Sequence, residues 1–422
     1  MSMTAEKKTG WRGWFTRAAH TVERMDGQVL HRAPEQKASH SATLMVPFGA
    51  GQPRFTPRQY DTLADEGYRK NVVAYRAIQL VSRNAACVPF VVYRGTGEGR
   101  FKVQDHPLVD LLRQPNPMQA GAEFFESVYA YYLIAGNSYL EAIRGLDGGV
   151  RELWTLRPDR MRVIPTAQGV VGAYRCQMGQ QHVDYPVNAV SGYADVLHLK
   201  TFHPLDDWYG MSPLEAAAVS VDQHNDAARW NASLLQASGR PSGALVFKPA
   251  HADAPDTLTE AQRASLRSEL EQYYTGSDRA GRPLVLEGGL DWREMSLSPK
   301  DMDWLAGKDV SAREIALAFH VPPQLIGIEG SLTFANFEQA RLALYDDAIL
   351  PLVEHMKAEL NAWLAPQFGN DIHIDYDLDH IEALAPRREK VWTRISGASF
   401  MTINEKRQAL GMGPLPDGDR LS

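Results

Sequence analysis

The sequence predicts an α+β fold, because its strand-like and helical segments are grouped along the chain instead of alternating regularly. Short runs of β-branched and aromatic residues recur between residues 88 and 199, which is typical of strands. Beyond residue 205 the chain changes to long segments with helical periodicity, and Ser-Pro pairs at 212–213 and 298–299 mark helix starts. With 422 residues and 44% hydrophobic content, the chain is long and apolar enough for about three domains.

Charge and cysteine content exclude several classes of protein. The formal net charge of -7 argues against a protein that grips nucleic acid by neutralising phosphates. The two cysteines, Cys87 and Cys176, form no CxxC or Cys/His pattern, so neither a disulfide scaffold nor a zinc site is expected. No apolar run approaches the roughly 18 residues of a membrane span, and no signal peptide is visible. We therefore expect a protein made in the cytoplasm.

Residues 1–58 are predicted to be a partly disordered arm. Bases and aromatic residues such as Lys8, Trp11 and Arg12 recur there at roughly helical spacing, which would allow contact with a membrane surface or a partner. A short arm leading into the polar stretch from His31 to Ser41 is the simpler interpretation. We assign the arm no chemistry.

Residues 59–210 form the first predicted domain. A helical apolar face from Val72 to Val81 is followed by a strand from Val88 to Tyr93. Three alternate glycines at 95, 97 and 99 then predict a hairpin turn, because they lie between two strands and open no helix, as a phosphate loop would. Further helices are expected from 108 to 112 and from 124 to 135. Further strands are expected at 138–143, 152–156, 162–165, 173–177 and 196–199.

A long helix is predicted over 212–238, at roughly 39 Å in length. Its apolar positions recur every seven residues: Leu214, Val221, Ala228 and Leu235. The stripe between them carries His224, Asn225 and Asn231, which are too polar for burial inside one subunit. We therefore expect this helix to pack against copies of itself.

The remaining elements follow in order. A small unit over 241–297 contains strands at 244–247, 283–287 and 291–297 and a helix opened by a capping box at 257–260. A second long helix over 299–320 ends at Pro322 and Pro323, and the glycine-containing loop 326–335 follows. A third helix over 336–364 is expected to kink at Pro351. Short helices are predicted from residue 386 onward.

We predict no catalytic residue, no cofactor site and no metal site. Walker, HExxH, GxSxG and Rossmann patterns are absent from the sequence. The acidic stretch Asp371–His380 contains ligands suited to a divalent ion, but apolar residues alternate with them, which favours a strand with one solvated face. His198 and His320 are interpreted as structural, because no nucleophile and acid are arranged around either in the sequence.

Short segments in a fixed order carry a family resemblance. They are Arg83–Ala86 with Val88-Pro89, His106–Leu108, Pro115-Asn116, Ala135–Tyr139, Val196–His198, Tyr209–Leu214, Ile315-Ala316, Phe319–Pro323, Phe334–Gln339, Leu350-Pro351 and Thr402–Arg407. From about Asn71 onward the chain thus resembles the portal proteins of long-tailed phages and gene transfer agents. One departure is Ala383–Arg388, which stands where many relatives carry an aspartate.

The resemblance implies a non-catalytic ring of about twelve subunits at the capsid vertex, a channel for DNA packaging and ejection. In this portal fold, 59–210 and 336–385 would be the wing, while 211–240 and 298–325 would be stem helices. Residues 241–297 would be the clip, 326–335 the tunnel loop and 386–422 the crown inside the capsid. Glu329, Ser331, Thr333 and Asn336 are expected to face the DNA, and an acidic chain suits its passage.

The implied partners are copies of the chain, the large terminase subunit, a head-to-tail adaptor, the major capsid protein and scaffold. Double-stranded DNA would pass without sequence recognition, no membrane would be bound, and the chain would reside in the virion after assembly in the host cytoplasm. Two alternatives remain: another head-tail connector or adaptor ring component, and a metal-dependent hydrolase that uses the acidic strand near 371–380.

Overall fold

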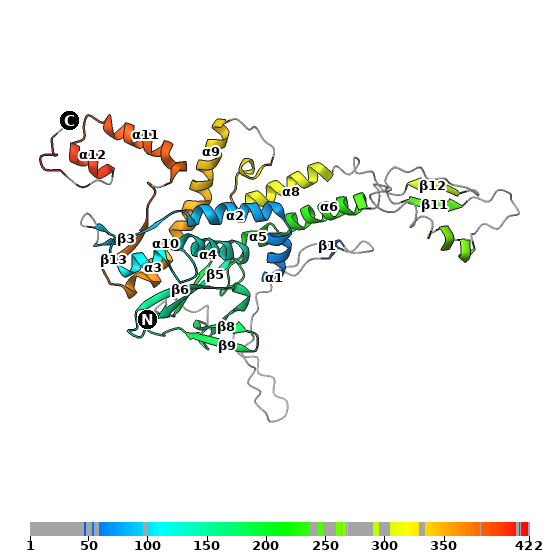
Figure 1. The fold of residues 1–422 in the computed structure, drawn as a ribbon, viewed down its shortest axis with the longest axis horizontal. Helices are drawn as coiled ribbons and strands as arrows, with labels where there is room; N and C mark the ends of the chain where they lie inside the picture. Colours follow the sequence, from blue (N-terminus) through cyan, green and yellow to red (C-terminus); the bar gives the residue numbers. More distant parts are fainter. Residues whose placement is uncertain are drawn as a thin grey trace, which may run out of the picture. The chain divides into compact units, whose positions relative to one another are not determined.

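The computed structural model of the chain describes residues 46–47, 53–54, 59–95, 100–236, 243–247, 259–262, 264–266, 268, 290–294, 304–328, 334–379, 381–410, 413 and 415–420. Helices and strands are grouped as an α+β arrangement, so the predicted fold class is confirmed (Figure 1). The predicted strand at 283–287 and the helix-start signals at Thr257 and Ser298 lie outside the described residues.

The first described helices pack together at the start of the chain's main core. They are α1 (Tyr60–Thr62), the π-helix η2 (Leu63–Arg69), α2 (Val72–Ala86), α3 (Pro107–Arg113) and α4 (Gly121–Ala135). Asn71 begins α2, because its Oδ1 accepts hydrogen bonds from the N–H groups of Val73 and Ala74 at 3.1 and 3.0 Å. Gly136 ends α4 at φ 68°, and a side chain there would lie 2.6 Å from the Met211 backbone, so only glycine fits.

One three-stranded antiparallel sheet, of order β13-β3-β4, combines two consecutive strands with a third that is distant in sequence. β3 (Phe90–Arg94) pairs with β4 (Phe101–Val103), as the alternate glycines predicted for a hairpin. β13 (Ile372–Tyr376) pairs with the other edge of β3, with Ile374 opposite Val92. The sheet therefore joins a segment from the C-terminal part of the chain to the first domain.

Two further three-stranded antiparallel sheets follow in the first domain. One has β10 (Val196–Lys200), β5 (Asn137–Arg144) and β6 (Val150–Leu156), and the other has β7 (Met161–Pro165), β8 (Val171–Met178) and β9 (Gln181–Pro186). The sequence prediction missed β9. The reason is that nearly all of β9 is exposed, so its sequence lacks the apolar alternation that marks a half-buried strand.

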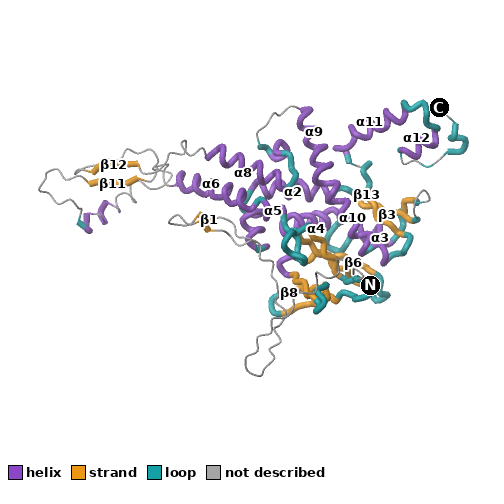
Figure 2. Tube along the Cα trace, turned by 180° about the vertical axis from the view of Figure 1, so that it is seen from behind, coloured by secondary structure: helices purple, strands orange, loops and turns teal. Residues whose placement is uncertain are grey.

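The predicted helix over 212–238 is divided in two. α5 (Pro213–Ala216) is separated from α6 (Ala218–Gln236) by Ala217, whose N–H is shared between the carbonyls of Pro213 and Glu215 in a tightened turn. α6 lies beside α8 (Trp304–Ala318) in both views of the chain (Figures 1 and 2). Between them in sequence, β11 (Gly243–Phe247) and β12 (Leu290–Glu294) form an antiparallel pair.

The third long helix is interrupted close to Pro351. α9 (Phe334–Leu344) runs into the π-helix η7 (Tyr345–Ile349), and α10 (Leu350–Trp363) begins at once after it. Because Pro351 has no N–H to donate, a wider turn before it relieves the clash with the preceding carbonyl. Two short helices, α11 (Ala385–Ser396) and α12 (Ile403–Ala409), follow β13.

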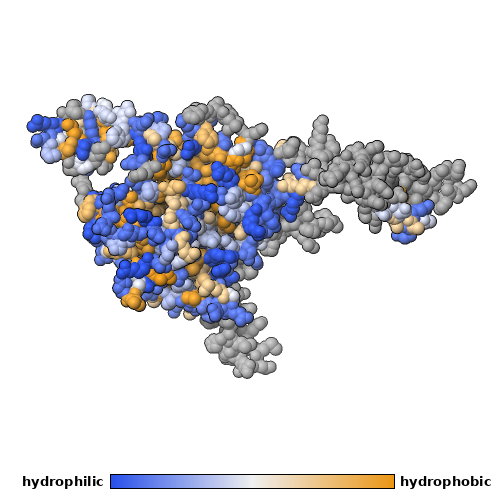
Figure 3. Space-filling view, viewed as in Figure 1, coloured by the Kyte–Doolittle hydropathy of each residue, from blue (hydrophilic) through white to orange (hydrophobic). Residues whose placement is uncertain are grey.

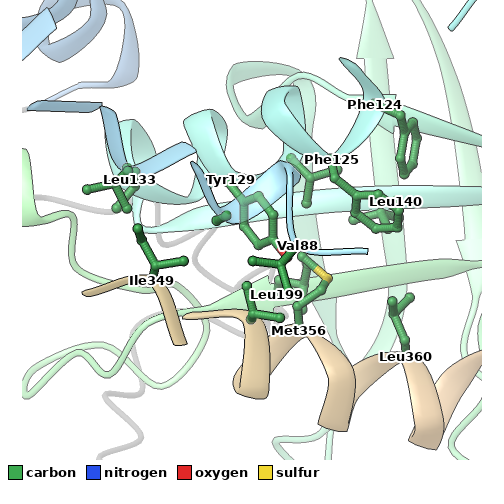
Figure 4. Packing of buried hydrophobic residues seen from close by; sticks show 14 of the residues in the cluster. Val88, Phe124, Phe125, Tyr129, Leu133, Leu140, Leu199, Ile349, Met356 and Leu360 are labelled. Carbon is green, nitrogen blue, oxygen red and sulfur yellow. The ribbon is translucent and has the colours of Figure 1, made fainter. Parts of the chain in front are cut away.

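The main hydrophobic core combines the first domain with α10. Figure 4 shows Tyr129 and Leu133 of α4 facing Ile349 and Met356 across the core, with Val88 between the two sides. All five of these residues are buried. Since each fully buried apolar side chain contributes about 1.5–3 kcal/mol, the two distant segments stabilise each other as one core.

Candidate assembly surfaces of the paired long helices

Helices α6 and α8 pack closely through small and polar residues. Ala227 of α6 and Ala312 of α8 are buried, which allows the two helices to approach. Ser220 Oγ donates a hydrogen bond to Glu314 Oε2 at 2.6 Å, and Ser311 Oγ donates to Gln223 Oε1 at 3.3 Å. The two helices therefore form one packed pair inside a single subunit.

Two of the four residues predicted to pack between subunits are instead buried in the chain's own core. Leu214 is 1% and Val221 is 2% exposed in the isolated chain, so the prediction is wrong for both. Leu214 is covered by the π-helix η2, where a Cβ on Gly67 would lie only 2.5 Å from Leu214 Cδ2. Ala228 is exposed and stays a prediction, and the side chain of Leu235 lies outside the described residues.

His224 and Asn225 of α6 are buried and Asn231 is half-buried, which corrects the expectation that these residues could not lie inside one subunit. Asn71 Nδ2 donates to Asn225 Oδ1 at 3.0 Å and to His224 Nδ1 at 3.2 Å. Asn225 Nδ2 in turn donates to the Glu66 carbonyl at 2.8 Å. Since Nδ1 of His224 accepts, its proton lies on Nε2, and burial lowers the pKa of this imidazole. Hydrogen bonds from Asn71 at the start of α2 therefore supply partners for the buried His224 and Asn225 side chains.

Asp222 stands apart from this network. Its side chain is 2% exposed, and no hydrogen-bond partner for its Oδ2 is present among the residues that the structure describes. Burial raises the pKa of Asp222 to about 7, and the nearby carboxylates of Asp226 and Glu66 add to the shift while Arg229 opposes it. The first turns of α6 therefore contain a buried carboxyl group whose pKa is near neutral pH.

An exposed apolar stripe lies on the outer face of α8. Ala306, Val310 and Leu317 fall within about 40° of one another at 3.6 residues per turn, and Val310 and Leu317 are 54% and 73% exposed. Arg313 shares this face, but its guanidinium pairs with Asp309 on the same helix at 3.0 Å. Figure 3 shows hydrophobic residues gathered over α9 and the neighbouring end of α8. An apolar face that the described residues leave exposed is typical of a surface for association.

The acidic stretch near 371–380 is a strand, as its alternation predicted. Ile372 and Ile374 of β13 are buried, while the acidic residues beside them form ion pairs with the adjacent strand segments. These pairs are Asp371 with Arg94 at 3.2 Å, Asp375 with Arg100 at 3.3 Å and Asp377 with Lys102 at 3.2 Å. Nowhere in the described residues do three or more His, Cys, Asp or Glu gather in a way that could hold a metal ion.

Of the two histidines singled out in the sequence, His198 has surroundings that fit a structural role. The ring of His198 stacks on Tyr139 with centroids 4.3 Å apart, and its Nε2 lies 2.9 Å from Asn137 Oδ1. Burial lowers the pKa of His198 to about 3, so it stays neutral in ordinary buffers. His320 is exposed just beyond α8, at a φ of 53°.

Of the four residues expected to face DNA, Asn336 alone lies within the described part of the chain. Glu329, Ser331 and Thr333 lie outside the described residues. Asn336 lies in the first turn of α9 and is half-buried. Among the described helices, none combines the length and apolarity needed to cross a membrane.

Comparison with known sequences supports a relationship over most of the chain. The family model described as phage portal protein matches residues 72–411. The portal protein of Enterobacteria phage HK97 is 27% identical over 372 residues, which cover 85% of this chain and 82% of that protein. An uncharacterized protein of Rickettsia bellii is 42% identical over 357 residues, covering 84% of this chain and 90% of that protein.

Comparison with solved structures gives the same answer. A chain in the neck of an empty gene transfer agent particle, computed with C6 symmetry, is similar with a TM-score of 0.65 and 41% identity. The similarity covers 87% of this chain and 97% of that chain. The match begins at α2, directly after Asn71 of the buried network, and includes α8, which carries the exposed stripe. The chain belongs to the phage portal protein family.

Proposed function

We propose that this portal protein forms a closed ring of about twelve copies at the vertex of a phage-like particle. The ring is the channel through which double-stranded DNA enters during packaging and leaves during ejection. Two observations support the proposal: similar chains occur in gene transfer agent necks computed with C6 and C12 symmetry, at 41% and 40% identity, and the family model covers residues 72–411.

The main structural support for the proposed ring is the exposed apolar stripe of α8. Ala306, Val310 and Leu317 are exposed among the described residues and lie on one face of α8, where the only charged side chain, Arg313, is ion-paired on the same helix. A head-to-tail ring buries the same face in every copy, because each subunit presents a different surface to each neighbour. The occupant of the stripe is then the adjacent subunit's α6, on which Ala228 is exposed and small enough for close helix packing.

The remaining roles follow the order of the segments along the chain. Residues 59–210 and 336–385 are the wing, the α6 and α8 segments are the stem, and residues 241–297 are the clip. The clip docks the terminase motor during packaging and the head-to-tail adaptor afterwards, while the crown over 386–422 lies inside the capsid. The motor supplies the ATP hydrolysis, and the tunnel loop over 326–335 acts as a loose collar on the DNA.

The ring is tested by negative-stain imaging and native mass spectrometry of the purified wild-type protein and its Leu317→Arg variant. Wild type is expected to form rings of about twelve copies with a central hole. Leu317→Arg should remain a folded monomer or dimer at micromolar concentration, because an unpaired charge replaces the apolar contact. Its far-UV circular dichroism spectrum should match that of wild type, since the substitution changes an exposed residue and leaves the subunit fold intact.

The matched control is Leu146→Arg in the exposed turn between β5 and β6. It makes the same chemical change away from α8 and should leave the ring intact. Rings of wild-type size and number from the Leu317→Arg protein would contradict the α8 interface. A wild-type protein that stays monomeric even with its adaptor would contradict the ring itself.

A further inference from the structure

The two C-terminal helices carry the opposite charge to the rest of the chain. Residues 385–410 contain six basic and two acidic residues, a net charge of +4, whereas the whole chain is -7. The remainder is therefore at -11. The basic residues are Arg387, Arg388, Lys390, Arg394, Lys406 and Arg407. Such segregation of charge is the electrostatic footprint of an anionic partner.

Three of these cations form a stripe along α11, which we call the basic stripe. Arg387, Lys390 and Arg394 are spaced i, i+3 and i+7, so they fall within about 60° on one face and span about 10 Å along the axis. All three are exposed. The only acidic residue of α11, Glu389, points at least about 100° away from any of them.

One side of α11 is held against the protein, and the basic stripe is exposed to solvent. Ile395 is buried and Val391 is half-buried on the packed side. Arg388 Nη1 donates to the Leu378 carbonyl at 3.0 Å. From α12, Lys406 Nζ donates to the Ser396 carbonyl at 3.4 Å. The helix is thus anchored at both ends.

The charges of the basic stripe are available to a ligand. Arg387 pairs with Asp346 at 2.9 Å, but the side chains are 63% and 47% exposed, and water screens such a pair strongly. Neither Lys390 nor Arg394 has a side-chain hydrogen bond or ion pair within the part of the chain that the structure describes. A phosphate group can therefore replace one weak contact and meet two free cations.

We propose that the basic stripe of α11 binds the phosphate backbone of duplex DNA without reading its sequence. Phosphates follow each strand every 3.4 Å or so along the duplex axis, so a stripe about 10 Å long can meet as many as three of them. Arginine and lysine side chains suit phosphate contacts of this kind. The choice of DNA as the anion rests on the proposed function, which brings duplex DNA to this protein.

A membrane surface fits the same helix less well. A helix that lies on a bilayer buries a broad apolar face opposite its cations. In α11 that apolar side is already used, since Ile395 is buried and Val391 is half-buried, and Trp392 is the residue left 49% exposed there. One partly exposed ring gives little area for insertion.

The stripe would give an acidic channel protein a local, salt-sensitive hold on DNA. Each subunit contributes few contacts, so one subunit binds weakly, and a ring repeats the contacts around the duplex. Because counterion release drives such binding, the hold weakens steeply as salt rises. DNA is retained without a site that would stop it from sliding.

The test compares the full-length protein with the variant Arg387→Gln, Lys390→Gln, Arg394→Gln. Fluorescence anisotropy measures binding to two labelled duplexes of unrelated sequence, each about 30 base pairs, between about 20 and 200 mM NaCl. We expect the triple variant to lose about tenfold or more in affinity at the low-salt end for both duplexes. Its slope of log K against log salt should be shallower by up to about 3 per subunit.

A second triple variant controls for net charge. Arg69→Gln, Arg113→Gln, Arg151→Gln removes three positive charges from side chains that are 74%, 71% and 61% exposed elsewhere on the chain. Its affinity should stay within about twofold of wild type. An equal loss in both triple variants, or no loss in the first, overturns the inference. Binding of wild type to phosphatidylglycerol vesicles but not to duplex DNA overturns it in favour of a membrane.

Imaging of the same three proteins separates this inference from the proposed function. Rings with a central hole in all three, combined with unchanged DNA affinity in the stripe variant, would refute the inference and leave the ring standing. Loss of DNA binding confined to the stripe variant, with no rings from any protein, would support the inference and count against the ring.

Discussion

Helices α6 and α11 both mix polar with apolar residues, and they use the polar ones in opposite ways. In α6, His224 and Asn225 are buried inside the subunit. In α11, Lys390 and Arg394 are exposed. One helix depends on its polar residues for packing, and the other presents them to solvent.

The difference is set by what lies across from each helix. Opposite α6 is the start of α2, where Asn71 supplies two donors to the buried side chains, and the Glu66 carbonyl accepts a third hydrogen bond. A buried polar group without such a partner would cost about 1–3 kcal/mol. The exposed cations of α11 need no partner, since water solvates them. Burial of a polar stripe thus depends on a partner distant in sequence.

The change with the largest expected effect is Asn71→Ala. It removes the cap of α2, worth about 1 kcal/mol, and leaves His224 Nδ1 and Asn225 Oδ1 without their buried donor, which costs about 1–3 kcal/mol more. We expect the free energy of unfolding to fall by about 3 kcal/mol. Urea denaturation followed by tryptophan fluorescence measures it.

Asn188→Ala is the matched control. The Asn188 side chain also accepts two backbone hydrogen bonds, from Val190 and Ser191 at 2.9 and 3.0 Å, but in an exposed turn. Its loss should cost less than about 1 kcal/mol because water replaces the bonds. Equal losses for the two variants would show that the buried network is not what holds α6 against α2.

Asp222→Asn should stabilise the protein increasingly as pH rises. The folded-state pKa of about 7 lies above the ordinary value of 3.8, so the folded chain holds a proton that the unfolded chain releases. Stability from this group is complete below about pH 4 and is lost as pH rises through 7. Asparagine cannot ionise, so its advantage over wild type should grow by about 2 kcal/mol between pH 4 and pH 8, about half of the limit set by the shift.

Urea denaturation at one-unit steps across that range measures the difference. Asp347→Asn, the same substitution at an exposed position, is the control. A constant offset for Asp222→Asn would mean that Asp222 is hydrated in the folded protein and does not belong to the buried part of α6.

The sequence carried enough information for the fold class, most strands and the family. Local chemistry specifies these features: the alternate glycines between β3 and β4 specify a hairpin, and the apolar alternation of β13 specifies a strand with one buried face. The mostly exposed β9 was missed, because a strand with only Tyr185 half-buried shows no apolar alternation.

The site was harder to predict. A seven-residue repeat shows that Leu214 and Val221 share a face, but not that η2 and the main core cover that face. Likewise α8 has apolar residues on two sides, and only packing reveals that Leu317 is outside while Ile315 is inside. The spacing of Arg387, Lys390 and Arg394 is present in the sequence. The prediction missed the basic stripe because it considered only the net charge of the whole chain.

The smallest expected effect is that of Thr402→Ala in the open C-terminal region. Thr402 Oγ1 accepts from the Glu405 N–H at 3.2 Å, and Glu405 Oε2 accepts from the Thr402 N–H at 2.7 Å, which closes a capping box on α12. Its loss should cost about 1 kcal/mol locally. Hydrogen exchange should therefore quicken about fivefold in α12 and not in α6, with an unchanged urea midpoint. A fall in the midpoint like that of Asn71→Ala would mean that α12 unfolds together with the main core. The C-terminal region would then not be independent of the core that contains α6.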